Sequence, residues 1–300
     1  MDLFEYQGKQ YFARYGIAVS VGGVALTVDE AVAQAELAEY PVVIKAQVQV
    51  GGRGKAGGIK LANNADEVRL HAKNILGMDI KGHIVKRVWV EHASDIAEEY
   101  YASFTLDRSA KRHLLMLSAQ GGVEIEHVAV VDPTAIVKLH VNPVEGLSLD
   151  AAKRAVVDAR ISEKAQDGVA AMLLKLYECF TKGDCDLAEI NPLILKPTGE
   201  VHALDAKVTL DANAAFRHPC GDRGAGQDAE PAPRAGRREA AFWYRLGQMP
   251  PVRRRQRRQS AGLRWRAWSG PRPSLSIWCR RSGAPMRFKA SSRRRRSSCG

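Results

Sequence analysis

A sharp change in composition at residue 218 limits how much of this 300-residue chain can form a folded domain. Residues 1–218 hold 24 Lys and Arg against 29 Asp and Glu, a net charge of −5. Residues 219–300 hold 21 against 4, a net charge of +17, and 20 of those 21 are arginine. Apolar periodicity ends at the same point. We therefore expect a folded domain over 1–218 and a poorly structured, Arg-rich tail over 219–300.

Segments typical of helices and strands alternate before residue 218, which predicts an α+β fold. Apolar residues at helical spacing, or a capping residue, predict helices over 4–15, 28–40, 65–76, 149–160 and 162–180. Short β-branched or alternating runs predict strands over 19–26, 42–44, 84–91, 100–106, 113–118 and 135–141. Two further runs, 187–195 and 201–208, flank a Lys-Pro-Thr-Gly-Glu turn and indicate a hairpin.

A glycine-rich basic loop follows the strand expected at 42–44. Lys45, near the end of that strand, is costly to bury unless its ammonium group meets an anion. The loop at 51–58 contains five glycines, and its amides, together with Arg53 and Lys55, could wrap a polyphosphate. A flexible, soluble surface turn explains the same loop. Neither the Walker A motif nor the Gly-x-Gly-x-x-Gly fingerprint fits it.

Two further groups of polar residues follow expected strands. Glu91, Ser94 and Glu99 could accept hydrogen bonds from a ribose hydroxyl, an adenine amine or a lysine, although these residues on their own favour a solvated acidic turn. Glu189 and Asn191 face the same way because they are two residues apart on one strand.

The returning strand of the expected hairpin brings Asp205 nearly opposite Asn191. Oxygen donors of this kind bind Mg²⁺ together with substrate phosphates and water. Polar residues on the wet face of a sheet are the alternative explanation.

Several classes of protein and location are disfavoured by simple features of the chain. The five cysteines show neither metal-binding spacing nor a disulfide framework, so a reducing, cytoplasmic location is expected. No apolar run reaches the roughly 18 residues of a membrane-spanning helix, so no membrane partner is expected. The N-terminus, with Asp2 and Glu5, is neither a signal peptide nor an acid-poor transit peptide.

Six motifs occur in one order and together resemble the β-subunit family of succinyl-CoA synthetase, the ADP- or GDP-forming succinate–CoA ligases. The resemblance covers residues 1–218. The motifs are Asp2-Leu3-Phe4-Glu5-Tyr6-Gln7, the loop at 51–58, Asp107-Arg108-Ser109, the Gly-Gly-Val-Glu-Ile-Glu run at 121–126, Glu189-Ile190-Asn191-Pro192-Leu193 and Leu204-Asp205-Ala206-Lys207.

The resemblance implies an ATP-grasp fold, in which two α+β lobes hold ATP or GTP between them. It implies nucleotide contacts from Lys45, Gly52, Arg53, Gly54, Glu91, Ser94 and Glu99, and Mg²⁺ ligands at Asn191 and Asp205. Glu189 would lie near a phosphohistidine that the partner α subunit supplies together with the CoA site. The implied reaction joins succinate and CoA to nucleotide turnover, reversibly, in the tricarboxylic acid cycle.

Residues 219–300 depart from that family's pattern. The flavodoxin-like second domain is not recognisable there, and arginine without lysine is what a GC-rich gene gives in a shifted reading frame. We therefore expect that this chain does not complete the ligase reaction, even with an α subunit. Two alternatives remain: a related subunit such as that of a malate–CoA ligase, or a nucleotide-binding domain with a basic RNA-binding tail. The aperiodic composition of the tail disfavours nucleic acid as a partner.

Overall fold

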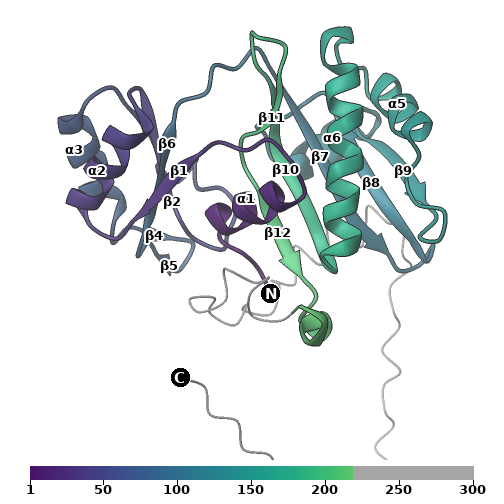
Figure 1. Ribbon diagram of the computed structural model, residues 1–300, viewed down its shortest axis with the longest axis horizontal. Helices are drawn as coiled ribbons and strands as arrows, with labels where there is room; N and C mark the ends of the chain where they lie inside the picture. The colour runs from purple at the N-terminus through teal and green to yellow at the C-terminus, as the bar shows by residue number, and fades with distance from the viewer. Residues whose placement is uncertain (219–300) are drawn as a thin grey trace, which may run out of the picture. The chain divides into compact units, whose positions relative to one another are not determined.

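The computed structural model describes residues 1–218, and the tail expected over 219–300 lies outside the described residues. Two antiparallel β-sheets, each with its own helices, form two lobes, and helix α1 (Glu5–Arg14) lies between them (Figure 1). The α+β architecture expected from the sequence is therefore confirmed. No helix among residues 1–218 is both long and apolar enough to cross a membrane.

The first lobe is a four-stranded sheet covered by two helices. Its strand order is β1-β6-β2-β3, and all neighbours are antiparallel. The strands are β1 (Gly22–Ala25), β2 (Val42–Ala46), β3 (Ile59–Ala62) and β6 (Val88–His92). Helices α2 (Val28–Ala38) and α3 (Ala65–Ile75) pack their buried valines and alanines against this sheet. The short hairpin of β4 (Asp79–Ile80) and β5 (His83–Ile84) completes the lobe.

Capping residues start the two helices of this lobe where the sequence predicts. The Thr27 hydroxyl accepts a hydrogen bond from the Glu30 amide at 3.2 Å, and the Asn64 side chain accepts one from the Glu67 amide at 3.0 Å. The single strand expected over 84–91 is wrong. The chain changes partners there, since His83 and Ile84 pair with β4 whereas β6 pairs with β1 and β2.

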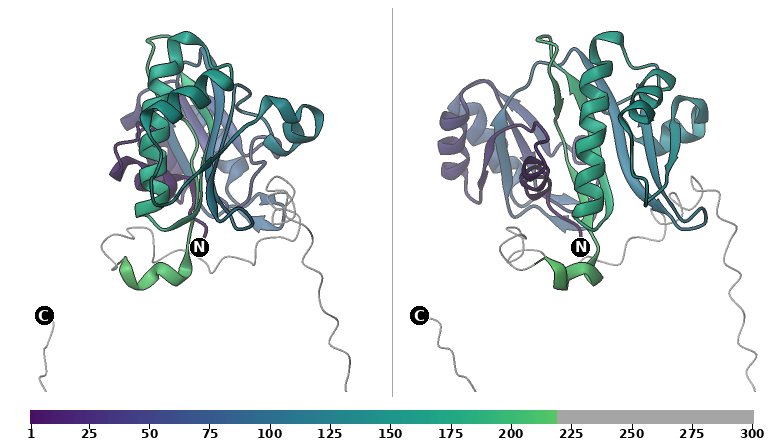
Figure 2. Two further views of the ribbon diagram at one scale, coloured as in Figure 1. Left: turned by 90° about the vertical axis from the view of Figure 1, so that its right-hand side faces the viewer. Right: turned by 45° about the vertical axis from the view of Figure 1, so that its right-hand side comes forward.

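The second lobe is a six-stranded sheet in the order β11-β10-β7-β8-β9, with β12 also paired to β10. The strands are β7 (Glu98–Asp107), β8 (Arg112–Ser118), β9 (Val137–Val141), β10 (Cys185–Leu195), β11 (Val201–Ala203) and β12 (Lys207–Leu210). Helices α5 (Leu149–Asp158) and α6 (Glu163–Lys182) cover one face (Figure 2). The short helix α4 (Ile125–Val131) packs on the opposite face. Two 3₁₀ turns, η1 (Pro133–Ala135) and η2 (Ala212–Arg217), complete the lobe.

The hairpin expected after residue 187 forms, but its returning strand is interrupted. Leu193 pairs with Ala203, and Glu189 pairs with Lys207 in the same register. The residues at 204–206 leave the ladder between β11 and β12, although the Leu204 amide still donates to the Pro192 carbonyl at 3.1 Å. The interruption leaves the side chain of Asp205 available to the first lobe.

Helix α1 belongs to the core of the second lobe through its apolar residues. Tyr11 and Phe12 are buried in that core. Gly8 lies so close to the second lobe that an added Cβ would come within 3.1 Å of the Ala206 Cβ, so only a glycine fits without displacement. The polar residues of the same helix, Glu5 and Lys9, are therefore turned toward the first lobe and become buried there.

His202, on β11, is expected to make the free energy of unfolding depend on pH. Its Nε2 atom lies 3.0 Å from the Ser20 hydroxyl, and burial, helped by Lys196, lowers the pKa of His202 to about 4. The unfolded chain binds the proton from about pH 6.5 downward. Stability is therefore lost as the pH falls from about 6.5 toward 4. Substituting His202→Gln should remove this part of the pH dependence when unfolding is followed at several pH values.

The exposed His127 gives the matched control, because His127→Gln should leave the pH profile of the free energy of unfolding unchanged. A His202→Gln profile parallel to that of the unaltered chain between pH 4 and 6.5 would contradict the prediction.

Candidate functional site

A buried cluster of charged side chains lies where the two lobes and α1 meet. It contains three cations and three anions, which are linked in a continuous chain of ion pairs. Its members are Glu5, Lys9, Lys45, Arg53, Glu91 and Asp205. The sheet of the first lobe supplies Lys45 and Glu91, the glycine-rich loop supplies Arg53, α1 supplies Glu5 and Lys9, and the interrupted hairpin supplies Asp205.

Lys45 and Arg53 are the two cations that connect the lobes. The ammonium nitrogen of Lys45 lies 3.0 Å from Glu5 Oε1 and 2.6 Å from Glu91 Oε1. It also donates to the Leu204 carbonyl of the second lobe at 3.1 Å. The guanidinium of Arg53 pairs with Glu5 and, at 2.6 Å, with Asp205. The anion that the sequence requires for a buried Lys45 is therefore provided within the protein.

The charges tolerate burial because they balance one another. Burial alone would lower the pKa of Lys45, but the carboxylates of Glu5, Glu91 and Asp205 outweigh it, so that pKa is raised. Burial alone would raise the pKa of Glu5, but Arg53, Lys45 and Lys9 hold it well below its ordinary value. Both groups are therefore charged at neutral pH.

Asp205 is the member of the cluster that reaches solvent. Its side chain is 28% exposed, whereas the other five side chains are at most 9% exposed. A ligand that approaches from solvent meets the Arg53–Asp205 pair first. Both ends of this pair have the chemistry for a metal-bound phosphate, since the guanidinium can bind the phosphate oxygens and the carboxylate can bind the metal.

The glycine-rich loop beside Arg53 folds back on itself. The Gly58 amide donates to the Arg53 carbonyl at 2.9 Å, the Gly57 amide to Gly54 at 3.0 Å, and the Ala56 amide to Gly52 at 3.1 Å. Gly52 adopts a φ of 87°, which favours glycine. Because the amides at 56–58 are engaged inside the loop, a phosphate cradle here has to use the amides that precede them.

A second polar group lies at the start of β7, around the Gly-Gly turn. The Asn191 carboxamide accepts a hydrogen bond from the Gly122 amide at 2.9 Å and donates to the Val123 carbonyl at 2.9 Å. The Gly121 amide donates to the Glu99 carbonyl at 3.1 Å. Asn191 therefore holds the loop that leads into α4. An exposed ion pair of 3.0 Å, between Lys55 and Glu124, links the glycine-rich loop to this segment.

Glu189 lies on β10, two residues before Asn191. Its carboxylate accepts a hydrogen bond from the Tyr101 hydroxyl at 3.1 Å. Burial raises the pKa of Glu189 above its ordinary value. A carboxyl group with a raised pKa in a partly apolar setting is typical of groups that exchange protons, as well as of structural carboxyls.

The structure unites four of the sequence-predicted site residues in one cluster: Lys45, Arg53, Glu91 and Asp205. Gly52 and Gly54 flank Arg53 in the loop. Ser94 lies instead in the connection between β6 and β7, and Glu99, Asn191 and Glu189 lie in the second lobe. The ligand contacts of all these residues, those in the cluster included, remain predictions.

Sequence reasoning missed Glu5 and Lys9. The sequence does show an acidic and a basic residue four positions apart on a helix, which indicates an ion pair, but such a pair usually lies in solvent. The aromatic residues of the same helix concealed it, because they account for the helical periodicity on their own.

The donor set at the cluster suits magnesium better than a transition metal. Residues 1–218 contain no group of three or more His, Cys, Asp and Glu side chains arranged for a metal ion. Mg²⁺ needs only one or two protein oxygens in addition to phosphates and water. At the cluster, the partly exposed carboxylate of Asp205 is a ligand of this type. The amide oxygen of Asn191 is of the same type, but it lies in the second polar group, where it accepts the Gly122 amide.

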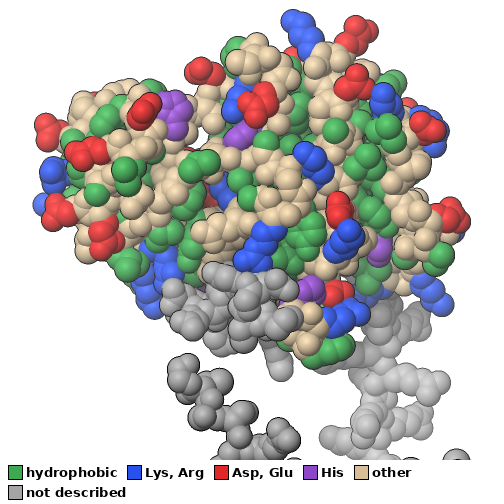
Figure 3. All heavy atoms as spheres, viewed as in Figure 1, with side chains coloured by type: hydrophobic (Ala, Val, Ile, Leu, Met, Phe, Trp, Pro, Cys, Tyr) green, Lys and Arg blue, Asp and Glu red, His purple; other side chains and the backbone are tan. Residues whose placement is uncertain are grey.

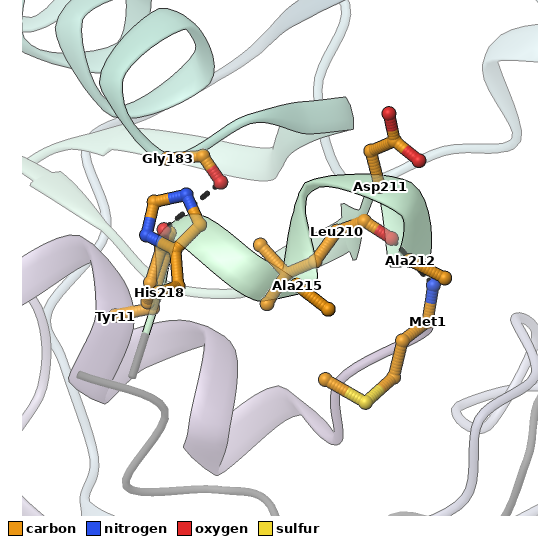
Figure 4. Close-up of a pocket in the computed structure, with 8 residues that line it drawn as sticks. All are labelled: Met1, Tyr11, Gly183, Leu210, Asp211, Ala212, Ala215 and His218. Atoms are coloured by element: carbon orange, nitrogen blue, oxygen red, sulfur yellow. Dashed lines mark hydrogen bonds between the residues drawn. The ribbon is translucent and has the colours of Figure 1, made fainter. Parts of the chain in front are cut away.

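A small hollow at the end of the described chain is separate from this cluster (Figure 4). Two hydrogen bonds join residues that line it. The Tyr11 hydroxyl donates to the Gly183 carbonyl at 3.2 Å, and the Met1 ammonium donates to the Leu210 carbonyl at 2.5 Å. Its lining is largely apolar and includes no member of the ion cluster. The lining includes no lysine or arginine side chain, and its Met1 ammonium group is bonded to the Leu210 carbonyl.

Acidic and basic side chains are interspersed on the face viewed in Figure 3. Residues 1–218 also carry a net charge of −5. The alternative of an RNA-binding tail concerns residues 219–300, which lie outside the described part of the chain.

Several solved structures share the fold of this chain. One is the dinucleotide-forming acetyl-coenzyme A synthetase 1 of Ca. Korarchaeum cryptofilum, with a TM-score of 0.59 and 19% identity over 70% of this chain and 93% of that chain. PH1788 of Pyrococcus horikoshii matches with a TM-score of 0.59 and 21% identity over 70% and 92%. The ATP citrate lyase of Methanothrix soehngenii matches with a TM-score of 0.54 and 20% identity over 84% and 57%.

At these identities the structural likeness concerns the fold. The sequence itself carries the family assignment, because the family model of the ATP-grasp domain matches residues 2–195. That range contains the four-stranded sheet, strands β7 to β10 of the six-stranded sheet, the glycine-rich loop and five of the six members of the ion cluster. The chain therefore belongs to the ATP-grasp family.

Proposed function

We propose that the chain binds a Mg²⁺–nucleoside triphosphate, either ATP or GTP, between its lobes and serves as the nucleotide-binding part of an acid–CoA ligase. One observation carries the proposal. Two buried cations, Lys45 and Arg53 of the glycine-rich loop, lie next to the partly exposed carboxylate of Asp205. Phosphoryl transfer depends on positioning and charge neutralisation, which this arrangement can supply.

Within this site each group has a separate task. Lys45 and Arg53 bind and orient the phosphates, while Asp205 and Asn191 would hold Mg²⁺, which neutralises phosphate charge when it is bound. The Arg53–Asp205 pair has to separate when both ligands arrive. Glu189, next to Tyr101, is the carboxyl group suited to contact a phosphohistidine from a partner.

The finer proposal is the β subunit of a succinate–CoA ligase, with an α subunit that brings the histidine and the CoA site. The six ordered motifs support it. The related Korarchaeum enzyme has been seen with coenzyme A and a phosphohistidine segment directed to its nucleotide site, which supports a reaction of the same type. A malate–CoA ligase would use the same nucleotide site, because the choice of acid does not depend on these residues.

A thermal unfolding experiment on the full chain tests the nucleotide proposal. Mg²⁺ with ATP or with GTP, at about 100 times the dissociation constant, should stabilise the folded state by about 2.7 kcal/mol. The same nucleotides with EDTA should stabilise it less, because Asp205 then keeps its pairing with Arg53. An unfolding temperature that neither nucleotide raises in the presence of Mg²⁺ would contradict the proposal.

A further inference from the structure

Glu5, a residue of α1 that the resemblance does not assign to the site, lies at the centre of the ion cluster. Its Oε1 atom contacts Lys9 at 3.1 Å and Lys45 at 3.0 Å. Its Oε2 atom pairs with Arg53 and accepts a hydrogen bond from the Gln47 side chain at 3.2 Å. One carboxylate therefore contacts both cations that face the phosphate site.

Lys9 strengthens this arrangement from the other side. Its ammonium group pairs with Glu5 and with Glu91, so it joins the two carboxylates that hold Lys45. The Trp89 indole also donates to Glu91, at 2.6 Å. Glu91 is thereby fixed in a position where it restrains Lys45.

The packing of α1 against the second lobe fixes the positions of Glu5 and Lys9. Gly8 allows the helix to lie against Ala206, and Tyr11 and Phe12 anchor it in the core of the second lobe. Glu5 and Lys9 therefore reach the first lobe from a rigid element that belongs to the second lobe. Rigid elements hold binding groups more accurately than loops do.

We propose that Glu5 and Lys9 are a positioning pair, which holds the side chains of Lys45 and Arg53 in the geometry that binds the phosphates of a nucleoside triphosphate. Lysine and arginine side chains lose much rotamer freedom when a ligand fixes them. Contacts that fix them in advance reduce that loss. The inference rests on the proposed nucleotide site, and it assigns the pre-organisation of that site to α1.

A charge-neutral double variant separates positioning from net charge. Glu5→Gln with Lys9→Met removes one anion and one cation, so the cluster keeps its balance. We expect the dissociation constant of the Mg²⁺–nucleoside triphosphate to rise about tenfold, because the phosphate-binding side chains are no longer fixed. The matching nucleoside, adenosine or guanosine, should bind the full chain with unchanged affinity, since it has no phosphate.

The exposed pair Asp29 and Arg69, 3.0 Å apart in the first lobe, supplies the matched control. Asp29→Asn with Arg69→Gln also removes one charge of each sign and should leave the affinity for the triphosphate unchanged. Unchanged triphosphate affinity in the folded Glu5→Gln/Lys9→Met chain would overturn the inference. Failure of the unaltered chain to bind any triphosphate would overturn the proposed function instead.

A second variant covers the case in which the double variant does not fold. Glu5→Asp keeps the charge but shortens the side chain by one methylene, so that one carboxylate no longer reaches both cations. Its circular dichroism should match that of the unaltered chain, and its affinity for the triphosphate should fall about threefold or more. A folded Glu5→Asp chain with unchanged affinity for both triphosphate and nucleoside would show that Glu5 is structural only.

Discussion

Replacing Lys45 with methionine is expected to lower the free energy of unfolding by about 3–5 kcal/mol. Lys45 lies between the carboxylates of Glu5 and Glu91, both of which are buried. Methionine has a similar length but no charge, so the two carboxylates lose a shared cation without a change in shape. Urea unfolding of the full chain, followed by far-ultraviolet circular dichroism, measures the effect.

The same substitution should also weaken binding of the Mg²⁺–triphosphate by about 1.5–3 kcal/mol, because a charge-assisted contact is lost. Lys60, exposed on the neighbouring strand β3, provides the control. Lys60→Met should change the free energy of unfolding by less than about 0.5 kcal/mol and leave binding unchanged. Equal stability losses for the two variants would contradict the account of the ion cluster.

Asp205→Asn is the second prediction with a large expected effect, and it concerns metal dependence. The amide keeps the size of the side chain but loses the charge that binds Mg²⁺ and pairs with Arg53. We expect the gain in triphosphate affinity that Mg²⁺ provides to fall by about tenfold. The stability loss should be smaller than for Lys45→Met, because the Asp205 side chain is 28% exposed.

Calorimetric titrations with ATP and GTP, in Mg²⁺ and in EDTA, measure the gain in triphosphate affinity that Mg²⁺ provides. They are made on the unaltered full chain and on the Asp205→Asn chain. Asp29→Asn removes an exposed carboxylate from the first lobe and should behave like the unaltered chain. If Asp205→Asn shows the same response to Mg²⁺ as the unaltered chain, the interrupted hairpin has a structural role only.

Local signals in the sequence predicted much of the fold. The caps at Thr27 and Asn64 depend on residues three positions away, and the hairpin of β10 depends on the turn at 196–200. The prediction of a single strand over 84–91 was wrong because the start of this run pairs with β4 and its end pairs with β2. A run of apolar residues does not specify which strands it will pair with.

The sequence also predicted that Lys45 needs an anion, but not which one. Glu5 is 40 residues away from it in the chain and Glu91 is 46 residues away, so spacing along the chain carries no information about this pairing. The sequence allowed Glu91 to accept a hydrogen bond from a ribose, an adenine or a lysine. In the structure it forms ion pairs with two lysines, Lys9 and Lys45. The contribution of α1 was hidden because Glu5 and Lys9 resemble an ordinary exposed helical pair.

A crystal structure of the full chain with Mg²⁺ and a non-hydrolysable nucleoside triphosphate would test the central claim most directly. That claim is that the buried ion cluster is a phosphate site. We predict phosphate oxygens within hydrogen-bonding distance of Lys45 and Arg53, with Asp205 turned from Arg53 toward the metal. A triphosphate bound elsewhere, with the pairing of Arg53 and Asp205 intact, would contradict the account.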